Sequence, residues 1–367
     1  MFVVPSIAFF AVLFAALVRS DCECGYTVNS TLYTDLIETD FLHLQNITGD
    51  TDWQGQDYTV SAELARGPYG KNASTTNIVA NPLKNEYDWA GDGVNGGDAG
   101  LQLIVRGGTP ENGGLIPMAE LVTSRDDMLY GSFRAGIKIT NVNGTCAAFF
   151  WYWNNTQEID MEFLSTQMNE TSSPVNLVLQ SPQSAKQGFS AQGTGGFVNQ
   201  QLPYQPDEGF HEYRFDWSPN AVEFYADGVL LQTLSKSVPN TPGHITLSHW
   251  SNGDPGWSAG PPVSDALLTV EYVKGYFNSS DPKRQEDWKS RCPSTATVNS
   301  TCAVPEVKEA PNGNSSAHTF FFSQEKNMTT NQTVGGEKSI ASSIRWTQTA
   351  STAVFVFMVA STMEWFI

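Results

Sequence analysis

Residues 147–164 read AAFFWYWNNTQEIDMEFL, and this stretch decides the fold that the sequence predicts. Residues 147–153 are rich in aromatic side chains, and residues 158–164 alternate acidic with apolar side chains. Both patterns are typical of β-strands, because a strand turns successive side chains to opposite faces. We therefore expect two strands here, the second with one acidic face and one apolar face.

Similar runs recur along the chain and predict further strands. They are LQLIV (101–105), SFRAGIKI (132–139), VNLVLQ (175–180), HEYRFDW (211–217), AVEFYAD (221–227), HITLSHW (244–250) and LLTVEYVKGYF (267–277). Turn-forming residues separate many of these runs. Asp227-Gly228 indicates a β-hairpin in particular, because both residues accept a positive φ.

Many short strands with turns at this spacing predict an all-β fold, a two-sheet antiparallel β-sandwich. No helical period is sustained between residues 25 and 278, so a parallel α/β fold is disfavoured. The stretch PKRQEDWKSRC (282–292) is expected to be a helix that packs outside the sheets. We place the globular domain at residues 21–293, a length that is normal for a large β domain.

Both ends of the chain resemble processing segments. Residues 1–20 contain an apolar run from Ile7 to Val18, which predicts a signal peptide; a buried N-terminal helix is the alternative. Residues 294–349 are rich in Ser, Thr and Asn and are expected to form a disordered linker. Residues 350–367 form a short apolar tail that predicts a GPI-attachment signal, with a tail-anchored helix or a disordered end as alternatives.

The glycosylation motifs and the cysteines indicate an oxidising compartment. Eleven N-x-S/T motifs suit a glycosylated exterior. Five cysteines would form two disulfides and leave one thiol. Cys292–Cys302 is the expected local pair, and either Cys22 or Cys24 could pair with Cys146. We therefore expect a secreted glycoprotein at the cell surface or in the cell wall.

The charge of the chain excludes one class of partner. The formal net charge is −18, and an acidic protein repels nucleic-acid phosphates, so no nucleic-acid partner is expected.

The five histidines show no paired metal-ligand spacing, and there is no phosphate-binding loop or G-x-S-x-G motif. We predict no cofactor or metal. We expect a monomer that is attached to the membrane only through its GPI anchor.

The acidic face of the predicted strand carries Glu158, Asp160 and Glu162. One interpretation is an ordinary amphipathic strand whose polar face is solvated. The other is a catalytic row, because acidic residues are depleted in strands and three like charges in file repel one another. Glycosidic bonds are commonly cleaved by one protonated and one ionised carboxyl group, and crowding raises the pKa of at least one acid. These considerations favour the catalytic interpretation.

These motifs resemble glycoside hydrolase family 16, which includes lichenases, laminarinases, xyloglucan transglycosylases and fungal cell-wall chitin–glucan transglycosylases. The sequence EIDMEF (158–163), preceded by an aromatic strand, is similar to the E-x-D-x-E signature of that family. Further matching elements, in the expected order, are residues 130–138, residues 215–228, Trp250 and residues 271–274. The resemblance implies a concanavalin-A-like jelly roll with a curved sugar-binding cleft, and a protein of fungal type.

The resemblance also implies roles for the three acids. Glu158 would be the nucleophile, Asp160 its helper and Glu162 the general acid/base of a retaining double displacement. The absence of an extra residue between Asp160 and Glu162 resembles the lichenase and transglycosylase branch rather than typical laminarinases. Thr156 and Ser248 stand where lichenases that resemble this chain carry tryptophan and asparagine, so strict lichenase specificity is not expected.

Five further side chains are expected to line a substrate-binding cleft. Trp250 matches a sugar-stacking tryptophan of the family, whereas Trp153, Arg125, Gln180 and His249 are placed by proximity. For each of these four the alternative is a structural role: a core aromatic, an ion pair, a solvated amide or a satisfied histidine. Some family members bind a structural calcium, but no cluster in this sequence indicates one.

Three functions follow from the resemblance. The first is a retaining endo-β-glucanase that acts on β-1,3(4)-glucans of a cell wall. The second is a transglycosylase that passes the same glycosyl-enzyme to a hydroxyl of glucan or chitin rather than to water, and surface anchoring favours this reading. The third is a non-catalytic lectin on the same fold, against which the acidic triplet argues.

Overall fold

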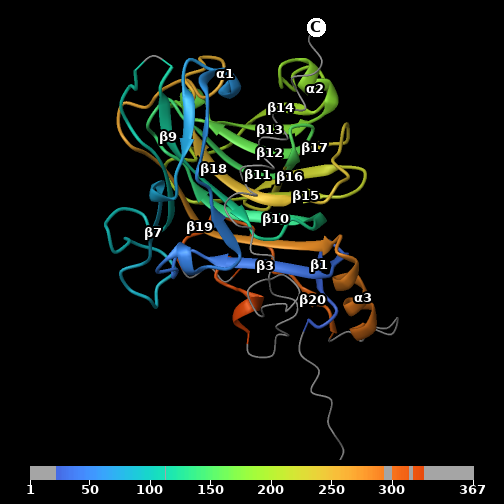
Figure 1. Cartoon of the computed structure of the whole chain (residues 1–367). Helices are drawn as coiled ribbons and strands as arrows, with labels where there is room; N and C mark the ends of the chain where they lie inside the picture. Colours follow the sequence, from blue (N-terminus) through green and yellow to red (C-terminus); the bar gives the residue numbers. More distant parts are fainter. Residues whose placement is uncertain (1–21, 112, 293–299, 314–316, 326–367) are drawn as a thin grey trace, which may run out of the picture. The chain divides into compact units, whose positions relative to one another are not determined.

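The computed structural model describes residues 22–111, 113–292, 300–313 and 317–325. The predicted signal peptide (1–20) and apolar tail (350–367) lie outside the described residues. Within those four ranges, no helix is long and apolar enough to cross a membrane. Strands dominate this part of the chain and form two large sheets and one small sheet (Figure 1).

The two large sheets are the layers of the predicted sandwich. The nine-stranded sheet contains, in spatial order, β14 (Phe197–Gln201), β13 (Pro174–Gln180), β12 (Gln157–Leu164), β11 (Cys146–Asn154), β18 (His244–Trp250), β9 (Leu115–Thr123), β6 (Gly70–Ala73) and β5 (Tyr58–Val60), with β4 (Trp53–Gly55) also paired to β9. The eight-stranded sheet contains β17 (Val229–Leu234), β16 (Val222–Ala226), β15 (His211–Trp217), β10 (Met128–Lys138), β19 (Ala266–Ser279), β8 (Gly100–Val105) and β7 (Ile78–Asn81), with β3 (Asp35–Asp40) also paired to β19. The small sheet joins β2 (Thr31–Tyr33), β1 (Tyr26–Val28) and β20 (Cys302–Ala303).

The predicted strands and the fold class are confirmed. Each strand-like run coincides with a strand of one of the large sheets. The predicted hairpin joins β16 to β17, with φ of 47° at Asp227 and 75° at Gly228. Pairing is antiparallel except between β6 and β9 and between β1 and β20, which run parallel.

Apolar side chains from both large sheets form the core, and they fix which way β12 faces. Ile159, Met161 and Phe163 on β12 are at most 2% exposed. The ring of Phe163 lies 4.6 Å from that of Tyr213 on β15 in the opposite sheet. Burying each such side chain contributes about 1.5–3 kcal/mol. Since successive side chains alternate, the acids of β12 must point away from the eight-stranded sheet.

The helices are short and lie outside the sheets. In the described ranges they are α1 (Ala62–Ala65), α2 (Pro182–Lys186) and α3 (Pro282–Arg291), with 3-10 turns at Ile47–Gly49, Thr75–Asn77, Ser165–Gln167 and Phe322–Gln324. The predicted helix is α3, which begins after Asp281, whose side chain accepts a hydrogen bond from the backbone of Lys283. In Figure 1, α1 and α2 lie near each other at one end of the described structure, and α3 lies at the opposite end.

The cysteine pairing differs from the expectation, although two disulfides and one free thiol are present as predicted. The disulfides are Cys22–Cys302 and Cys24–Cys292. Cys146 is free and buried. It lies on β11 in the middle of the nine-stranded sheet, whereas the other four cysteines gather around β1, β20 and the end of α3.

The expected disordered linker (294–349) and the expected domain end at residue 293 need correction for the part that is described. Residues 300–313 and 317–325 pack against the globular body through β20 and through Phe321 and Phe322, which are 3% and 4% exposed. The folded unit therefore continues to Glu325.

Buried charges explain why this segment is ordered despite its polar composition. The Lys274 ammonium on β19 donates hydrogen bonds to the carbonyls of His318 at 2.8 Å and Phe320 at 2.7 Å. The backbone N–H of Ser323 donates to the Glu38 carboxylate at 3.0 Å. Buried charges require such partners, and the segment supplies them from its backbone, which composition does not reveal.

Candidate active site

The three acids of β12 lie in an unbroken register with both neighbouring strands. Their partners on β11 and β13, respectively, are Tyr152 and Gln180 for Glu158, Phe150 and Val178 for Asp160, and Ala148 and Asn176 for Glu162. No bulge interrupts β12 between Glu158 and Glu162. All three side chains therefore share the outer face of the nine-stranded sheet, which we call the carboxylate face.

The carboxylate face is not a solvated face. Asp160 is 3% exposed, and Glu158 and Glu162 are half-buried. Three acids would not be withdrawn from water without a compensating role, since burial penalises their ionised forms. The structure therefore argues against the ordinary amphipathic strand.

Burial makes the three acids weaker than usual. It raises the pKa of Glu158 to about 7, although a hydrogen bond with Asp160 opposes the rise. Burial, together with the charges of Glu158 and Glu162, raises the pKa of Asp160 well above its usual range. Asp160 therefore keeps its proton and donates it in a hydrogen bond to Glu158. Of the two acids, Glu158 is the one that ionises to a carboxylate.

Glu162 has its own set of partners. Burial raises its pKa, while hydrogen bonds with Cys146 and Trp257 act in the opposite direction. The thiol of Cys146 donates to Oε1 of Glu162, with Sγ at 3.4 Å. Burial raises the pKa of this thiol well above its usual range, so it stays neutral and remains a donor. The two glutamates thus have different surroundings, as a nucleophile and a proton donor require.

A lysine and a fourth carboxylate extend the carboxylate face over β18, β9 and β6. The ammonium of Lys71 lies 3.3 Å from the centre of the Trp250 ring. The hydroxyl of Tyr58 donates to Glu120 at 3.0 Å, and Glu120 lies opposite Ser248. Burial raises the pKa of Glu120 and lowers the pKa of Lys71 to about 8. These polar groups offer hydrogen-bond partners suited to sugar hydroxyls.

Two of the five predicted binding residues lie on the carboxylate face. Gln180 is the direct cross-strand partner of Glu158, and its side-chain oxygen accepts a hydrogen bond from Ser184 at 2.7 Å. Trp250 on β18 lies opposite Cys146 on β11, and β11 is the strand between β18 and β12. Their proximity to the acids is consistent with the prediction, and contact with substrate stays a prediction.

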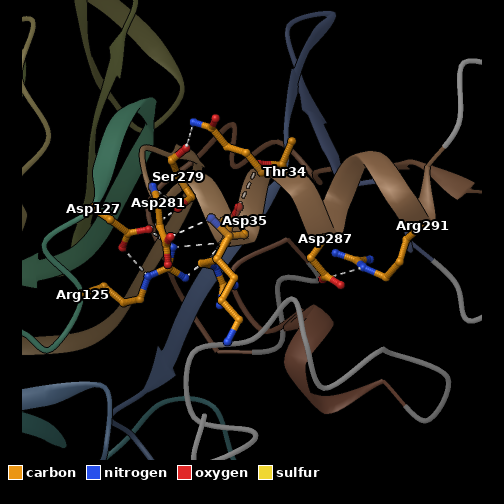
Figure 2. Close-up of polar contacts among 11 residues, drawn as sticks. Thr34, Asp35, Arg125, Asp127, Ser279, Asp281, Asp287 and Arg291 are labelled. Carbon is orange, nitrogen blue, oxygen red and sulfur yellow. Dashed lines mark hydrogen bonds and ion pairs between the residues drawn. The ribbon is translucent and has the colours of Figure 1, made fainter. Parts of the chain in front are cut away.

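Arg125 is not brought to the carboxylate face. Figure 2 shows it beside Asp127 and Asp35, next to α3. Its guanidinium contacts Asp35 at 3.2 Å and also pairs with Asp127. The side chain is held in this buried ion-pair network, which corrects its placement in the cleft.

His249 is also absent from the carboxylate face. His249 is fully buried, and its Nδ1 lies 2.9 Å from the carbonyl of Leu103 on β8 in the opposite sheet. It points into the core because Trp250, its neighbour, points outward. Trp153 is 40% exposed at the hairpin end of β11, where the register shifts between Tyr152 and Asn154, and its contact with substrate stays a prediction.

Several residues of the face were missed in the sequence analysis. They are Tyr58, Lys71, Glu120, Cys146 and Trp257. Glu120 could have been found, because it is a lone acid within the strand-like run LIPMAELVT (115–123). Cys146 begins the nine-residue strand β11 but was expected to form a disulfide. Tyr58, Lys71 and Trp257 come from short strands or a loop whose place in the sheet no local pattern reveals. Among the described residues, no group of three or more His, Cys, Asp and Glu side chains could hold a metal ion.

Comparison with known proteins assigns the family. The sequence model of glycosyl hydrolases family 16 matches residues 87–274, just over half of the 367-residue chain. The chain therefore belongs to glycosyl hydrolase family 16.

Two individual relatives are each at most 30% identical to the chain. The chain is 30% identical over 166 residues to a beta-glucanase of Paenibacillus macerans, an alignment that covers 43% of this chain and 58% of the relative. It is 28% identical over 179 residues to the Crh-like protein UTR2 of Candida albicans, covering 45% of this chain and 33% of that protein. The match thus spans less than two thirds of the length of these curated relatives.

Solved structures of similar proteins have low sequence identity. A beta-1,3-1,4-glucanase (lichenase) from a mouse hindgut metagenome superimposes with a TM-score of 0.48 at 20% identity, covering 66% of this chain and 98% of that one. The Crh5 transglycosylase in its apo form superimposes with a TM-score of 0.40 at 16% identity, covering 67% of this chain and 88% of that one.

Proposed function

We propose that the chain is a retaining endo-β-glucanase that acts on cell-wall β-1,3(4)-glucan through a covalent glycosyl-enzyme. The observation that carries this proposal is the unbroken register of β12, which puts Glu158, Asp160 and Glu162 together on one half-buried face. The beta-glucanase of Paenibacillus macerans and the family match support it. A lectin would have no use for three acids withdrawn from water.

The surroundings of the acids suggest how the reaction proceeds. The carboxylate of Glu158 attacks the anomeric carbon, while Glu162 donates its proton to the departing glycosidic oxygen. Asp160 stays protonated and orients Glu158 by their shared hydrogen bond. In the second step Glu162, now ionised, takes a proton from the attacking water, and the bond between sugar and Glu158 breaks.

A second candidate function is transfer of the glycosyl group to a sugar hydroxyl of glucan or chitin. The similarity to the Crh-like protein of Candida albicans favours it, and the departures at Thr156 and Ser248 argue against a strict lichenase. The residues and the intermediate are the same in both reactions, and the acceptor alone differs.

One experiment tests both functions. The protein is incubated with β-1,3-glucan and with mixed-linkage β-1,3-1,4-glucan, each with and without a labelled oligosaccharide acceptor, and product lengths are measured. Unlabelled products that only shorten support hydrolysis, and labelled products longer than the acceptor support transfer. No change in any glucan would contradict the proposed function.

Activity is expected to fall on the acidic side of neutrality. Glu158 must be ionised to attack, and its pKa is raised to about 7, so kcat/KM should decrease as the pH falls through this value. Replacing Asp160 with alanine removes the hydrogen bond that lowers this pKa, and the acidic limb of the profile should move to higher pH. An acidic limb near pH 4.5 in the wild type, with no movement in the variant, would contradict this assignment.

Replacing Glu162 with alanine is expected to lower the rate about 10²–10⁴-fold, since the general acid/base is lost. Added azide should restore turnover of a substrate with a good leaving group, because azide needs no deprotonation to attack the glycosyl-enzyme. Glycosyl azide is the product to be measured. A variant that keeps the wild-type pH profile would count against Glu162 as the acid/base.

We further propose that the protein is secreted, glycosylated and of fungal origin, and that a GPI anchor attaches it at the cell surface or in the cell wall, where it acts as a monomer on β-glucan. The two disulfides, which suit an oxidising compartment, support an extracellular location. Release of the protein from intact cells by a phosphatidylinositol-specific phospholipase would test the anchor.

A further inference from the structure

Two segments that adjoin strands near opposite edges of the nine-stranded sheet meet above the sheet. Arg66 directly follows α1, which lies between β5 and β6, whereas Phe189 lies in the loop after α2, which follows β13. The strands β12, β11, β18 and β9 separate β13 from β6 in the sheet. At about 4.8 Å per strand, five spacings place β13 and β6 roughly 24 Å apart along a flat sheet.

Despite that separation, the two side chains touch. The guanidinium carbon of Arg66 lies 4.5 Å from the centre of the Phe189 ring. A guanidinium nitrogen of Arg66 also lies 3.5 Å from the carbonyl of Gly188, at the outer limit of a hydrogen bond. We call this contact the Arg66–Phe189 clamp. The segments that carry it must therefore extend over the face of the sheet to reach each other.

The clamp lies above the three acids of β12 rather than at a distant part of the sheet. The Gln180 amide donates to the carbonyl of Phe189 at 3.4 Å, and Gln180 is the cross-strand partner of Glu158. The positive charge of Arg66 acts on both Glu158 and Glu162 and lowers the pKa of each, against the larger effect of burial. Both ends of the clamp are thus close to the acids.

Both clamp residues hold a backbone conformation that favours glycine. The φ angle is 59° at Arg66 and 69° at Phe189. Residues with side chains avoid this left-handed region, and at the end of a helix it is usually occupied by glycine. Strained conformations persist where the surroundings hold them, and they concentrate at functional sites. Here the Asn252 amide donates to the carbonyl of Ala65 at 2.6 Å, and Phe189 N–H donates to the carbonyl of Ser184 at 2.8 Å.

We propose that the Arg66–Phe189 clamp determines which glucans reach the catalytic acids, a proposal that rests on the proposed function. A short oligosaccharide or a chain end can pass beneath the contact. The interior of a long chain can reach Glu158 and Glu162 only when the contact opens, because the chain would otherwise have to be threaded from its end. The clamp therefore restricts attack on long chains more than attack on short ones.

The test compares long and short substrates of one linkage. The variants are Arg66→Gly, Phe189→Gly and the double variant, and glycine suits the left-handed backbone at both positions, so each should fold. The ratio of kcat/KM for a soluble long glucan to that for a short oligosaccharide is expected to rise about tenfold in each single variant. The double variant should rise no further, since both changes remove one contact.

Controls separate the contact from flexibility and from charge. Arg66→Asn and Phe189→Asn should give the same rise, because asparagine also tolerates the left-handed region without the freedom of glycine. Each ratio is measured at the pH optimum of the variant, which removes the effect of the Arg66 charge on the acids. Leu64→Ala, at a 55% exposed side chain of α1, should leave the ratio unchanged.

The possible outcomes are distinct. An unchanged ratio with an active wild type, or an equal fall on both substrates, would overturn the clamp and leave the proposed function standing. An equal fall would show instead that the two residues bind sugar generally. A wild type that acts on neither substrate would remove the proposed function and the clamp with it.

Discussion

Replacing Glu158 with glutamine is expected to reduce glucan cleavage by at least about 10³-fold while the domain stays folded. Glutamine keeps the size and shape of the side chain, but its amide cannot attack the anomeric carbon. The register of β12 with β11 and β13 involves backbone atoms and does not depend on this charge. The loss should therefore appear in kcat rather than in the folded fraction.

The stability of this variant should even rise at neutral and higher pH. Burial raises the pKa of Glu158 from 4.5 to about 7, so the folded state holds a proton that the unfolded state has released. The contribution of Glu158 to stability therefore falls as the pH rises from about 4.5 to 7, and glutamine avoids this cost. The melting temperature of the variant should match the wild type at pH 4 and exceed it at pH 8.

A matched control is Glu170→Gln, an exposed acid of the loop before β13. This change is expected to leave both cleavage and melting temperature unaltered. Undiminished release of glucan fragments by the Glu158→Gln variant would refute the nucleophile assignment, whatever its stability.

The strands and the acidic row could be predicted because both depend on local patterns. The alternation over 158–163 states which side chains share a face before any neighbour is known. The Asp227-Gly228 turn is local in the same way, since it depends on two residues that accept positive φ. Such patterns need no knowledge of which strands pair with which.

The remaining residues of the site depend on pairing that is not local. Glu120 and Lys71 reach the carboxylate face only because β9 and β6 follow β18 in the sheet. Arg125 lies just before β10 in the sequence. Its side chain is nevertheless held by an ion pair at 3.2 Å with Asp35, a residue distant in sequence. His249 is a different case, because alternation with Trp250 already implied that both could not face the cleft.

Ending the chain at Pro293 is expected to lower the free energy of unfolding by several kcal/mol. The deletion removes Cys302 and with it the Cys22–Cys302 disulfide. Because Cys24–Cys292 already closes the long loop, the second disulfide closes only the short stretches 22–24 and 292–302, which corresponds to about 3 kcal/mol. A typical domain is stable by only about 5–15 kcal/mol, so this loss is large.

Lost burial adds to the loss of the disulfide. Phe321 and Phe322 are 3% and 4% exposed, and each buried aromatic side chain is worth about 1.5–3 kcal/mol. The Lys274 ammonium would also lose its carbonyl partners on the segment and meet water instead. Urea and thermal unfolding of the shortened chain should therefore show a midpoint well below that of the full chain.

Two comparisons identify what the segment contributes. A chain that ends at Glu325 retains all of these contacts and should unfold like the full chain. Cys302→Ser in the full chain removes only the disulfide, so it should lose about 3 kcal/mol and stay more stable than the chain that ends at Pro293. Equal midpoints for the full chain and the chain ending at Pro293 would mean that residues 300–325 lie on the sandwich without stabilising it. The carboxylate face would then depend on the two large sheets alone.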